Sequence, residues 1–409
     1  MRIFHLALAF TLSLSVACDP KGDLSCQPAD ELCNDADDDC DGAIDEGVGE
    51  TYYADIDGDG WGAELLASCD APPDKPTQGG DCADEDASVW PGAEDVWYDG
   101  VDADCDGWSD YDQDHDGEDH WDYGGTDCRD RAPEVGATRC ENLLIVQNGT
   151  LSEITPAGDV VNARDIVDPT TGELTGGAGV VMDDWGNIHV YNTYPIRGSF
   201  LSTLSADFET WTHILIDGDR DAAGVGSYGQ LGVDAEHIWV PDIHNAGGAP
   251  GGLYRFEIST GTLTYLVVDG SYGNAHVGPD GLLYAQVAST GEDIDVFDPA
   301  TGALLWQIDL PFEDDVRSFA IDQAGGIWSA DWNDALVAYD SAGVETQRFD
   351  FAPDVRDLES IAIDARGRIA IGARFGELIL GQIGDESFEI IDTDPFSQEA
   401  KVAWVAPSR

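Results

Sequence analysis

The sequence predicts a mainly β protein, in which a six-bladed β-propeller (residues 141–409) follows an irregular acidic module stabilised by disulfides and calcium. Three observations support this prediction. Apolar strand–turn–strand segments recur after residue 141, and four strands in about 40 to 45 residues is the size of a propeller blade. The preceding part instead contains all nine cysteines and a repeated D-x-D-x-D-G motif. It is also more charged, since residues 18–140 hold 38 acidic and 5 basic residues, whereas the longer segment 141–409 holds 44 and 12.

The overall charge excludes some classes of function. The 409 residues include 82 Asp and Glu but only 18 Lys and Arg, which gives a formal net charge of −64. A nucleic-acid-binding protein needs clustered basic residues, so we expect no nucleic-acid partner, and no attachment to anionic lipid through a basic patch. The chain is still expected to fold, because 42% of its residues are hydrophobic and 12 are Trp.

The N-terminus predicts export. Arg2 precedes an apolar stretch, residues 3–17, that is too short to span a membrane, and residues 1–17 are predicted to be a signal peptide. Cys18 follows, as in bacterial lipoprotein precursors, and is the predicted lipidation site at the start of a short tether, residues 18–25. Its lipidation leaves eight cysteines, an even number suited to disulfides. The alternative is ordinary cleavage and secretion with an unlipidated Cys18; the prediction is therefore an outer-membrane lipoprotein of the cell envelope or a secreted protein.

The acidic module, residues 26–140, contains four D-x-D-x-D-G loops, at 37–42, 55–60, 102–107 and 112–117. Alternate carboxylates surround a hard cation, and the glycine permits a sharp turn. These are not EF-hands, because none has a Glu at the twelfth position. Two loops have an Asp at the ninth position instead, as in thrombospondin type 3 calcium repeats. The predicted metal ligands are Asp37, Asp39, Asp41, Asp45, Asp55, Asp57, Asp59, Asp102, Asp104, Asp106, Asp110, Asp112, Asp114 and Asp116.

These segments resemble a known family. Residues 31–42, 53–62 and 81–86, with Pro-Gly-Ala-Glu at 91–94, are similar to the MopE-type metal-binding repeat of bacterial surface proteins, which would cover about residues 26–140. The family positions and short separations favour disulfides between Cys33 and Cys40 and between Cys69 and Cys82. In the second unit Tyr98 replaces the first cysteine, so the family pattern leaves Cys105 without a partner. The pairing of the other four stays open: Cys26, Cys105, Cys128 and Cys140.

The chemistry of the module favours calcium as the cofactor. The family name points to copper, but copper prefers imidazole and sulfur ligands, and the module offers only His115 and His120. Dense carboxylates suit calcium. An Asp-rich linker that binds nothing would require neither the repeated glycine nor the cysteines. Four calcium ions leave the module strongly negative, so either the medium screens it or there are further ligands, with Asp81, Asp84, Asp86, Asp127 and Asp130 as candidates.

Five segments of the C-terminal part share one strand–turn–strand template. Their matching positions lie 42 to 51 residues apart and are Asp183, Asp234, Gly278, Asp322 and Asp364. A further hairpin at 144–161 and a lone strand at 400–405 are predicted to join and close a ring of six blades. The template is similar to that of NHL and lactonase-like six-bladed propellers, a resemblance that implies the fold and not the activity.

Polar residues of the template are expected to face the central channel: Asn192, Asp242, His244, Asn274, His276, Arg317, Asp331, Glu359 and Arg374. Asp242, His244 and His276 are weak catalytic candidates, as metal ligands or as a base and its orienting partner. The alternative is a hydrogen-bonded channel without chemistry. We therefore expect a non-enzymatic surface protein whose propeller binds an envelope or extracellular protein or glycan; the alternative is a propeller enzyme of lyase or lactone hydrolase type on a calcium-stabilised spacer.

Overall fold

A computed structural model describes residues 30–407, except 72, 74–75, 195–197, 218–228, 243–251, 269, 289, 291–292, 312–315, 332–333, 353–354 and 393–399. The predicted signal peptide, Cys18, Cys26 and His244 lie outside the described residues. No helix in the described part of the chain is long and apolar enough to cross a membrane.

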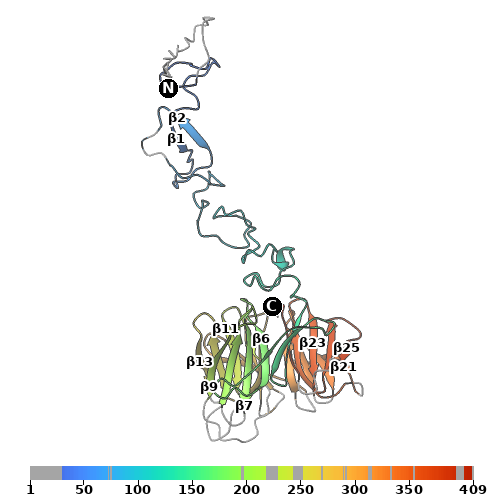
Figure 1. The fold of residues 1–409 in the computed structure, drawn as a ribbon. Helices are drawn as coiled ribbons and strands as arrows, with labels where there is room; N and C mark the ends of the chain where they lie inside the picture. Colours follow the sequence, from blue (N-terminus) through green and yellow to red (C-terminus); the bar gives the residue numbers. More distant parts are fainter. Residues whose placement is uncertain are drawn as a thin grey trace, which may run out of the picture. The chain divides into compact units, whose positions relative to one another are not determined.

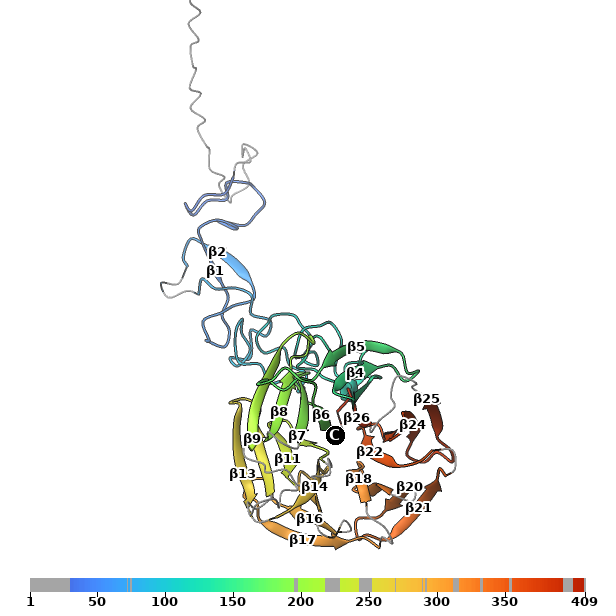
Figure 2. The same ribbon diagram turned by 60° about the horizontal axis from the view of Figure 1, so that its bottom comes forward.

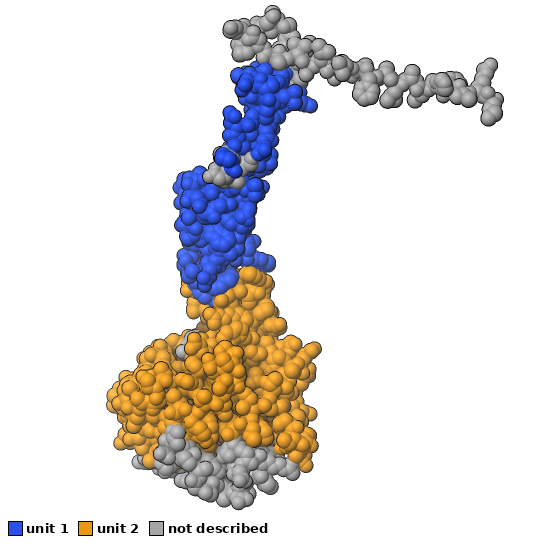
Figure 3. Space-filling view, turned by 90° about the vertical axis from the view of Figure 1, so that its left-hand side faces the viewer, with its two compact units in different colours: residues 1–111 blue, residues 112–409 orange. Residues whose placement is uncertain are grey.

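The chain divides into two compact units, Met1–Tyr111 and Asp112–Arg409, which Figure 3 shows in different colours. The sequence placed the boundary after residue 140. Residues 112–140 belong to the second unit because Cys128, Val135 and Cys140 share a hydrophobic core with propeller strands.

Among its described residues, the first unit has little regular structure and almost no buried hydrophobic side chains. Its strands, β1 (Glu50–Tyr53) and β2 (Leu65–Ser68), form an antiparallel hairpin (Figure 1). Val89 is the only buried hydrophobic side chain among its described residues. The buried side chains are instead carboxylates: Asp37, Asp38, Asp81 and Asp110. Hydrophobic burial therefore does not explain how this unit becomes compact.

The second unit is a ring of six four-stranded antiparallel sheets, which confirms the predicted six-bladed propeller (Figure 2). Within this unit, a short 3₁₀ helix, η1 (Trp121–Tyr123), precedes the first blade. Blade 1 consists of β26 (Lys401–Trp404), β3 (Leu143–Gln147), β4 (Thr150–Ile154) and β5 (Val160–Asp165). Blade 2 consists of β6 (Gly176–Met182), β7 (Ile188–Tyr194), β8 (Gly198–Leu204) and β9 (Trp211–Asp217). Blade 3 consists of β10 (Gly232–Val233), β11 (His237–Asp242), β12 (Gly252–Glu257) and β13 (Thr262–Val268).

The remaining blades follow in chain order. Blade 4 consists of β14 (Tyr272–Val277), β15 (Leu283–Val287), β16 (Asp293–Phe297) and β17 (Leu304–Asp309). Blade 5 consists of β18 (Val316–Ile321), β19 (Ile327–Asp331), β20 (Ala335–Tyr339) and β21 (Glu345–Asp350). Blade 6 consists of β22 (Leu358–Ile363), β23 (Arg368–Ala373), β24 (Glu377–Gln382) and β25 (Glu389–Asp392).

The last strand closes the ring, as the sequence predicted. β26 pairs with β3 in antiparallel register, from Lys401 opposite Val146 to Trp404 opposite Leu143. All four residues of β26 and all five of β3 are buried, whereas most of the outer strand β5 is exposed. Burial on both faces explains the continuous apolar run at residues 143–146 of β3, whereas other inner strands also carry buried polar residues such as Arg317 and Glu359.

In five of the blades, an aspartate in the turn between the first two strands links that turn to the second strand. Its carboxylate accepts a hydrogen bond from a side chain on the next strand: Asp234 from Trp239 Nε1 (3.0 Å), Asp280 from Tyr284 Oη (2.9 Å), Asp322 from Trp328 Nε1 (2.8 Å) and Asp364 from Arg368 Nε (2.6 Å). In blade 2, Asp183 lies 2.9 Å from His189 Nε2, and Thr203 Oγ1 lies 3.0 Å from His189 Nδ1. This Thr–His–Asp arrangement resembles a catalytic triad, but its repetition with Trp, Tyr and Arg identifies it as a structural element of the blade.

Candidate metal centres

The four D-x-D-x-D-G loops have the same backbone conformation. In each, the glycine N–H donates to the first carboxylate of the loop, and the third carboxylate accepts the N–H two residues after it. The glycine bonds are Gly42 to Asp37 (3.1 Å), Gly60 to Asp55 (3.2 Å), Gly107 to Asp102 (3.1 Å) and Gly117 to Asp112 (2.9 Å). The second set is Ala43 to Asp41 (2.9 Å), and Trp61 to Asp59, Trp108 to Asp106 and Glu118 to Asp116 (2.8 Å each). These bonds curl each loop so that alternate carboxylates gather on its inner side.

Backbone geometry explains the repeated glycine. The loop glycines have φ values of 102°, 100°, 81° and 94° for Gly42, Gly60, Gly107 and Gly117. A Cβ atom at any of them would meet nothing within 4 Å. The glycine is therefore required by its left-handed backbone and not by a lack of space.

In the first three loops the three motif carboxylates have oxygens within 4.8 Å of one another. Further acidic residues join the first loop, because oxygens of Glu31 and Glu46 lie within the same distance of each other and of Asp39. Glu46 Oε2 is buried and has no hydrogen-bond partner. Asp45, a predicted ligand, instead accepts the backbone N–H groups of Asn34 and Asp35 (both 3.0 Å).

The second loop contains buried carboxylate oxygens that no donor satisfies. They are Oδ2 of Asp57 and of Asp59, and Oδ2 of Asp81, which is 5% exposed. Burial raises the pKa of Asp57, and the charges of Asp59, Asp81 and Asp55 add to that increase. Isolated buried carboxylates are unfavourable, so this arrangement fits a cation that would occupy the centre.

The third loop is similar. Asp95 Oδ1 accepts the N–H of Ala103 (3.0 Å), and burial together with the charges of Asp106, Asp95 and Asp102 raises the pKa of Asp104. The predicted ligand Asp110 is 7% exposed; its Oδ2 accepts the N–H of Gly100 (2.6 Å), and its Oδ1 is buried without a partner.

The fourth loop lies in the second unit, beside residues 127–130. Asp127 is fully buried (0% exposed), and burial, with the charges of Asp114, Asp116 and Asp130, raises its pKa to about 7. Burial and the charge of Asp116 raise the pKa of Asp114 to about 6. Cys128 and Cys140 lie next to Asp127, but they form a disulfide and offer no thiolate to a metal.

The donor set therefore fits a hard, oxygen-preferring divalent cation. The two histidines of the module are not among the carboxylate groups described above. His115 is exposed, and His120 Nδ1 accepts the N–H of Asp122 (3.4 Å) at the start of η1. Burial lowers the pKa of His120. Dense carboxylates with unsatisfied oxygens match calcium better than copper.

The predicted disulfide pairing was wrong. Cys33 pairs with Cys69, and Cys82 pairs with Cys105, across sequence separations of 36 and 23 residues. Because the β1–β2 hairpin reverses the direction of the chain, Cys69 lies beside Val48, which follows the first loop in sequence. Backbone bonds from Trp90 to Ala103 (2.9 Å) and from Gly92 to Asp104 (3.0 Å) hold the segments of Cys82 and Cys105 together. Cys40 is disulfide-bonded as well, and Cys128 pairs with Cys140.

The centre of the propeller is filled with buried polar side chains. Glu359 Oε2 lies 3.5 Å from both Arg317 Nη1 and Lys401 Nζ, and all three residues are at most 4% exposed. Asn274 donates to Gln286 and to Arg317 O (3.0 Å).

The other channel candidates have separate surroundings. Asn192 donates to Ser202 Oγ (2.6 Å), and Asp331 accepts the N–H of Ala335 (2.9 Å). The N–H of Arg374 donates to Asp357 O (3.0 Å). His276 lines a cavity of about 50 Å³, and Asp242, which is 2% exposed at the end of β11, is not among the residues that line it.

Several functional residues were not predicted from the sequence. Lys401 lies on a strand identified only by its hydrophobic residues, and its charge gave no indication that it pairs with Glu359. Glu31 and Asp95 precede the first Asp of their loops by six and seven residues, a similar but not identical spacing. Asp81, Asp127 and Asp130 were recognised as candidates but not assigned to a loop.

Comparison with known proteins supports the metal-binding motif. The Cu-binding MopE family model, described as "Putative metal-binding motif", matches residues 28–46 and 81–110, which include the first and third loops. The comparison with curated proteins found no match. Among solved structures, apo AztD from Citrobacter koseri is similar with a TM-score of 0.40 and 10% identity, over 64% of this chain and 97% of that chain. The chain thus combines a metal-binding motif with a six-bladed propeller, and its disulfides indicate an extracellular or periplasmic location.

Proposed function

We propose that this protein is an exported calcium-binding surface protein, anchored by lipid at Cys18, whose propeller binds an envelope or extracellular protein or glycan. One observation carries the calcium part: among its described residues the first unit buries four carboxylates and only one apolar side chain, and several carboxylate oxygens of this unit lack any donor. A cation supplies the compensating charge that such a unit needs to be compact.

The calcium part is tested by isothermal titration calorimetry on the full chain after chelation. We expect calcium to bind at several sites and copper to bind without displacing it. The triple variant Asp39→Asn, Asp57→Asn and Asp104→Asn removes one central carboxylate from each of the first three loops, and we expect it to lose most of the heat. Asp70→Asn is the matched control, because Asp70 is exposed and outside the loops. Equal binding by the triple variant and the control would contradict the proposal.

The partner part rests on an exposed apolar strand. Leu304, Leu305 and Trp306 follow one another on β17 and are 56%, 47% and 45% exposed. Natural edge strands are usually protected by charge, so this apolar edge supports a contact with another molecule. We expect Leu305→Lys to reduce cross-linking of the protein on intact cells, and Val344→Lys, at a 59% exposed site on another blade, to leave it unchanged.

The anchor is tested by fractionation. Cys18→Ser should move the protein from the membrane fraction to the soluble exported fraction, since a lipid chain on Cys18 is the proposed attachment. Retention in the membrane fraction would contradict the anchor and leave the calcium proposal intact.

A further inference from the structure

The fourth loop, residues 112–117, differs from the other three because it belongs to the same compact unit as the propeller. Its backbone follows the common pattern, with Gly117 N–H on Asp112 Oδ2 (2.9 Å) and Asp116 N–H on Asp114 Oδ1 (3.2 Å). The family model does not reach this loop, since its second match ends at residue 110.

A second segment adds carboxylates to this loop. Asp130 Oδ1 accepts the N–H of Gln113 (3.1 Å), which fixes residues 127–130 against the loop. Asp127 is fully buried; its Oδ1 accepts the N–H of Arg129 (3.0 Å), and its Oδ2 has no hydrogen-bond partner. Asp114 Oδ2 is likewise buried and unsatisfied. A buried, unsatisfied carboxylate oxygen beside other carboxylates is unfavourable by itself, and a bound cation would compensate its charge.

The same segment, residues 127–130, also contacts the chain where the propeller ring closes. Arg129, two residues after Asp127, is 5% exposed and donates from Nε to Val405 O (2.8 Å), the residue directly after β26. Its Nη1 also bonds Asp184 Oδ1 (3.2 Å), in the turn of blade 2. Asp127 thus fixes the backbone of Arg129, whose side chain binds the chain directly after the closing strand β26.

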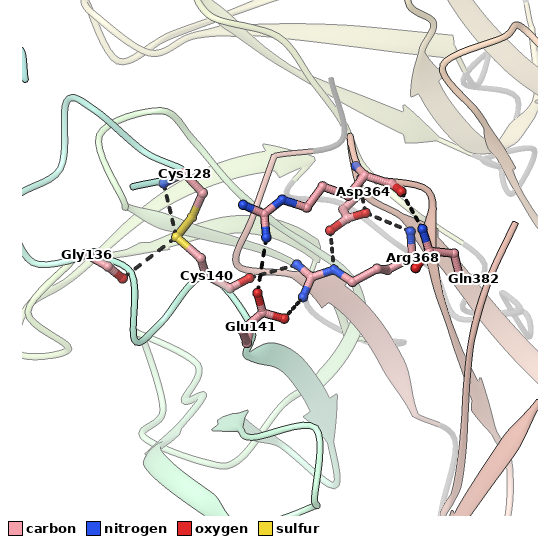
Figure 4. Close-up of polar contacts among 8 residues, drawn as sticks. Cys128, Gly136, Cys140, Glu141, Asp364, Arg368 and Gln382 are labelled. Atoms are coloured by element: carbon pink, nitrogen blue, oxygen red, sulfur yellow. Dashed lines mark hydrogen bonds and ion pairs between the residues drawn. A yellow bond between two sulfur atoms is a disulfide. The ribbon is translucent and has the colours of Figure 1, made fainter. Parts of the chain in front are cut away.

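Further contacts bind residues 112–140 to blades 1 and 6 (Figure 4). The Cys128–Cys140 disulfide contributes to the core that contains β3 and β26. Cys140 O accepts a hydrogen bond from Arg368 Nη2 (2.9 Å), and Arg368 also pairs with Glu141. Arg366 stacks on Trp121 at 4.2 Å from the ring centroid.

We propose that the fourth loop, together with Asp127 and Asp130, is a calcium site that stabilises the closed propeller ring. The inference rests on the proposed function, because it takes the cation to be calcium. Calcium that binds only when the fourth loop and residues 127–130 are folded together stabilises the folded protein by mass action. At a free calcium concentration of about 100 times Kd, such binding multiplies the folding equilibrium constant by about 100.

The test is urea unfolding of the full chain with and without saturating calcium. Far-UV circular dichroism is the readout, because every strand of the described residues except β1 and β2 belongs to the propeller. We expect calcium to raise the folding equilibrium constant of the wild type about 100-fold, and that of Asp127→Asn less than about 10-fold. The Asn retains Oδ1 for the Arg129 N–H while removing the charge. Asp70→Asn, at an exposed site of the first unit outside the metal loops, is the matched control and should keep the full increase.

The outcomes separate this inference from the proposed function. If calorimetry shows calcium binding but calcium stabilises Asp127→Asn and Asp70→Asn equally, the inference is overturned and the proposed function stands. If no calcium binds to the wild type, the proposed function itself fails. Should Asp127→Asn not fold, Asp114→Asn, on the half-buried loop, replaces it with the same expected loss.

Discussion

At the scale of single residues, glycine conformation and buried carboxylates define the metal loops. Every loop ends in a glycine with positive φ, and no neighbouring atom prevents a side chain there. The loop therefore depends on the backbone freedom of that glycine, while its charge comes from the carboxylates around it.

Gly60→Ala tests this dependence. Gly60 has φ of 100°, so alanine there should be strained by about 1 to 2 kcal/mol and should weaken calcium binding at the second loop about 10-fold. Calorimetric titration measures the change. Gly176→Ala is the control, since Gly176 also has open space around it but no positive φ; it should bind calcium like the wild type. Wild-type affinity in Gly60→Ala would show that the turn tolerates a side chain.

A second prediction at this scale concerns the aspartate of the blade turn. Trp328→Phe removes the indole N–H that donates to Asp322 Oδ2 and leaves a nearly buried carboxylate with one donor fewer. We expect a loss of about 1 to 3 kcal/mol in the free energy of unfolding, measured with urea. Trp306→Phe, at a 45% exposed site, should change it by less than about 0.5 kcal/mol. Similar losses for both variants would show that the bond to Asp322 contributes little.

At the scale of elements, the closing strand β26 joins the two ends of the propeller sequence. Its buried residues pair with β3, and Arg129 holds the chain directly after it. The stability of the ring therefore depends on a short strand whose side chains are all buried.

Val402→Ala measures that dependence. Val402 is completely buried on β26, so loss of two methyl groups and the resulting cavity should reduce the free energy of unfolding by about 2 kcal/mol. Val161→Ala, on the outer strand β5 at 50% exposure, should lower it by less than about 0.5 kcal/mol. If the two variants unfold at the same urea concentration, β26 does not limit the stability of the ring.

Element order was predictable because apolar periodicity and turn residues are local signals. The closing strand was found this way, and so were five of the blade turns. Asp280 was missed because the template position in blade 4 is Gly278, and the aspartate two residues later takes its role.

The Cys33–Cys69 disulfide was also missed, because it depends on how the β1–β2 hairpin reverses the chain, which spacing alone does not reveal. The loop carboxylates were predictable from spacing, whereas their additional partners Glu31 and Asp95 come from other segments.

At the scale of the whole molecule, the net charge of −64 acts differently in the two units. The propeller has several buried hydrophobic clusters that oppose charge repulsion. The first unit has only one buried hydrophobic side chain among its described residues, so its compactness depends on disulfides and counter-charge.

Salt should therefore partly replace calcium. In a chelator, we expect the Stokes radius of the full chain to fall as the salt concentration rises from about 0.01 M to about 1 M, because the screening length shortens from about 30 Å to about 3 Å. With saturating calcium the radius should already be small and change little. Size-exclusion chromatography gives the measurement, and a radius independent of both salt and calcium would refute the account.

The position of β26 in the chain also constrains the order of folding. Blade 1 takes three of its strands from the beginning of the propeller sequence and the fourth from its end, so Val146 pairs with Leu151 of β4 on one side but has no partner on the other side until Lys401 is present. Such a pairing has a very large sequence separation, which slows folding and delays the final step until residues 401–404 have been synthesised. A chain truncated before residue 401 would leave the buried edge of β3 exposed, ready to pair with a strand of another molecule. Residues 401–404 thus decide between a closed ring and an open edge that promotes aggregation.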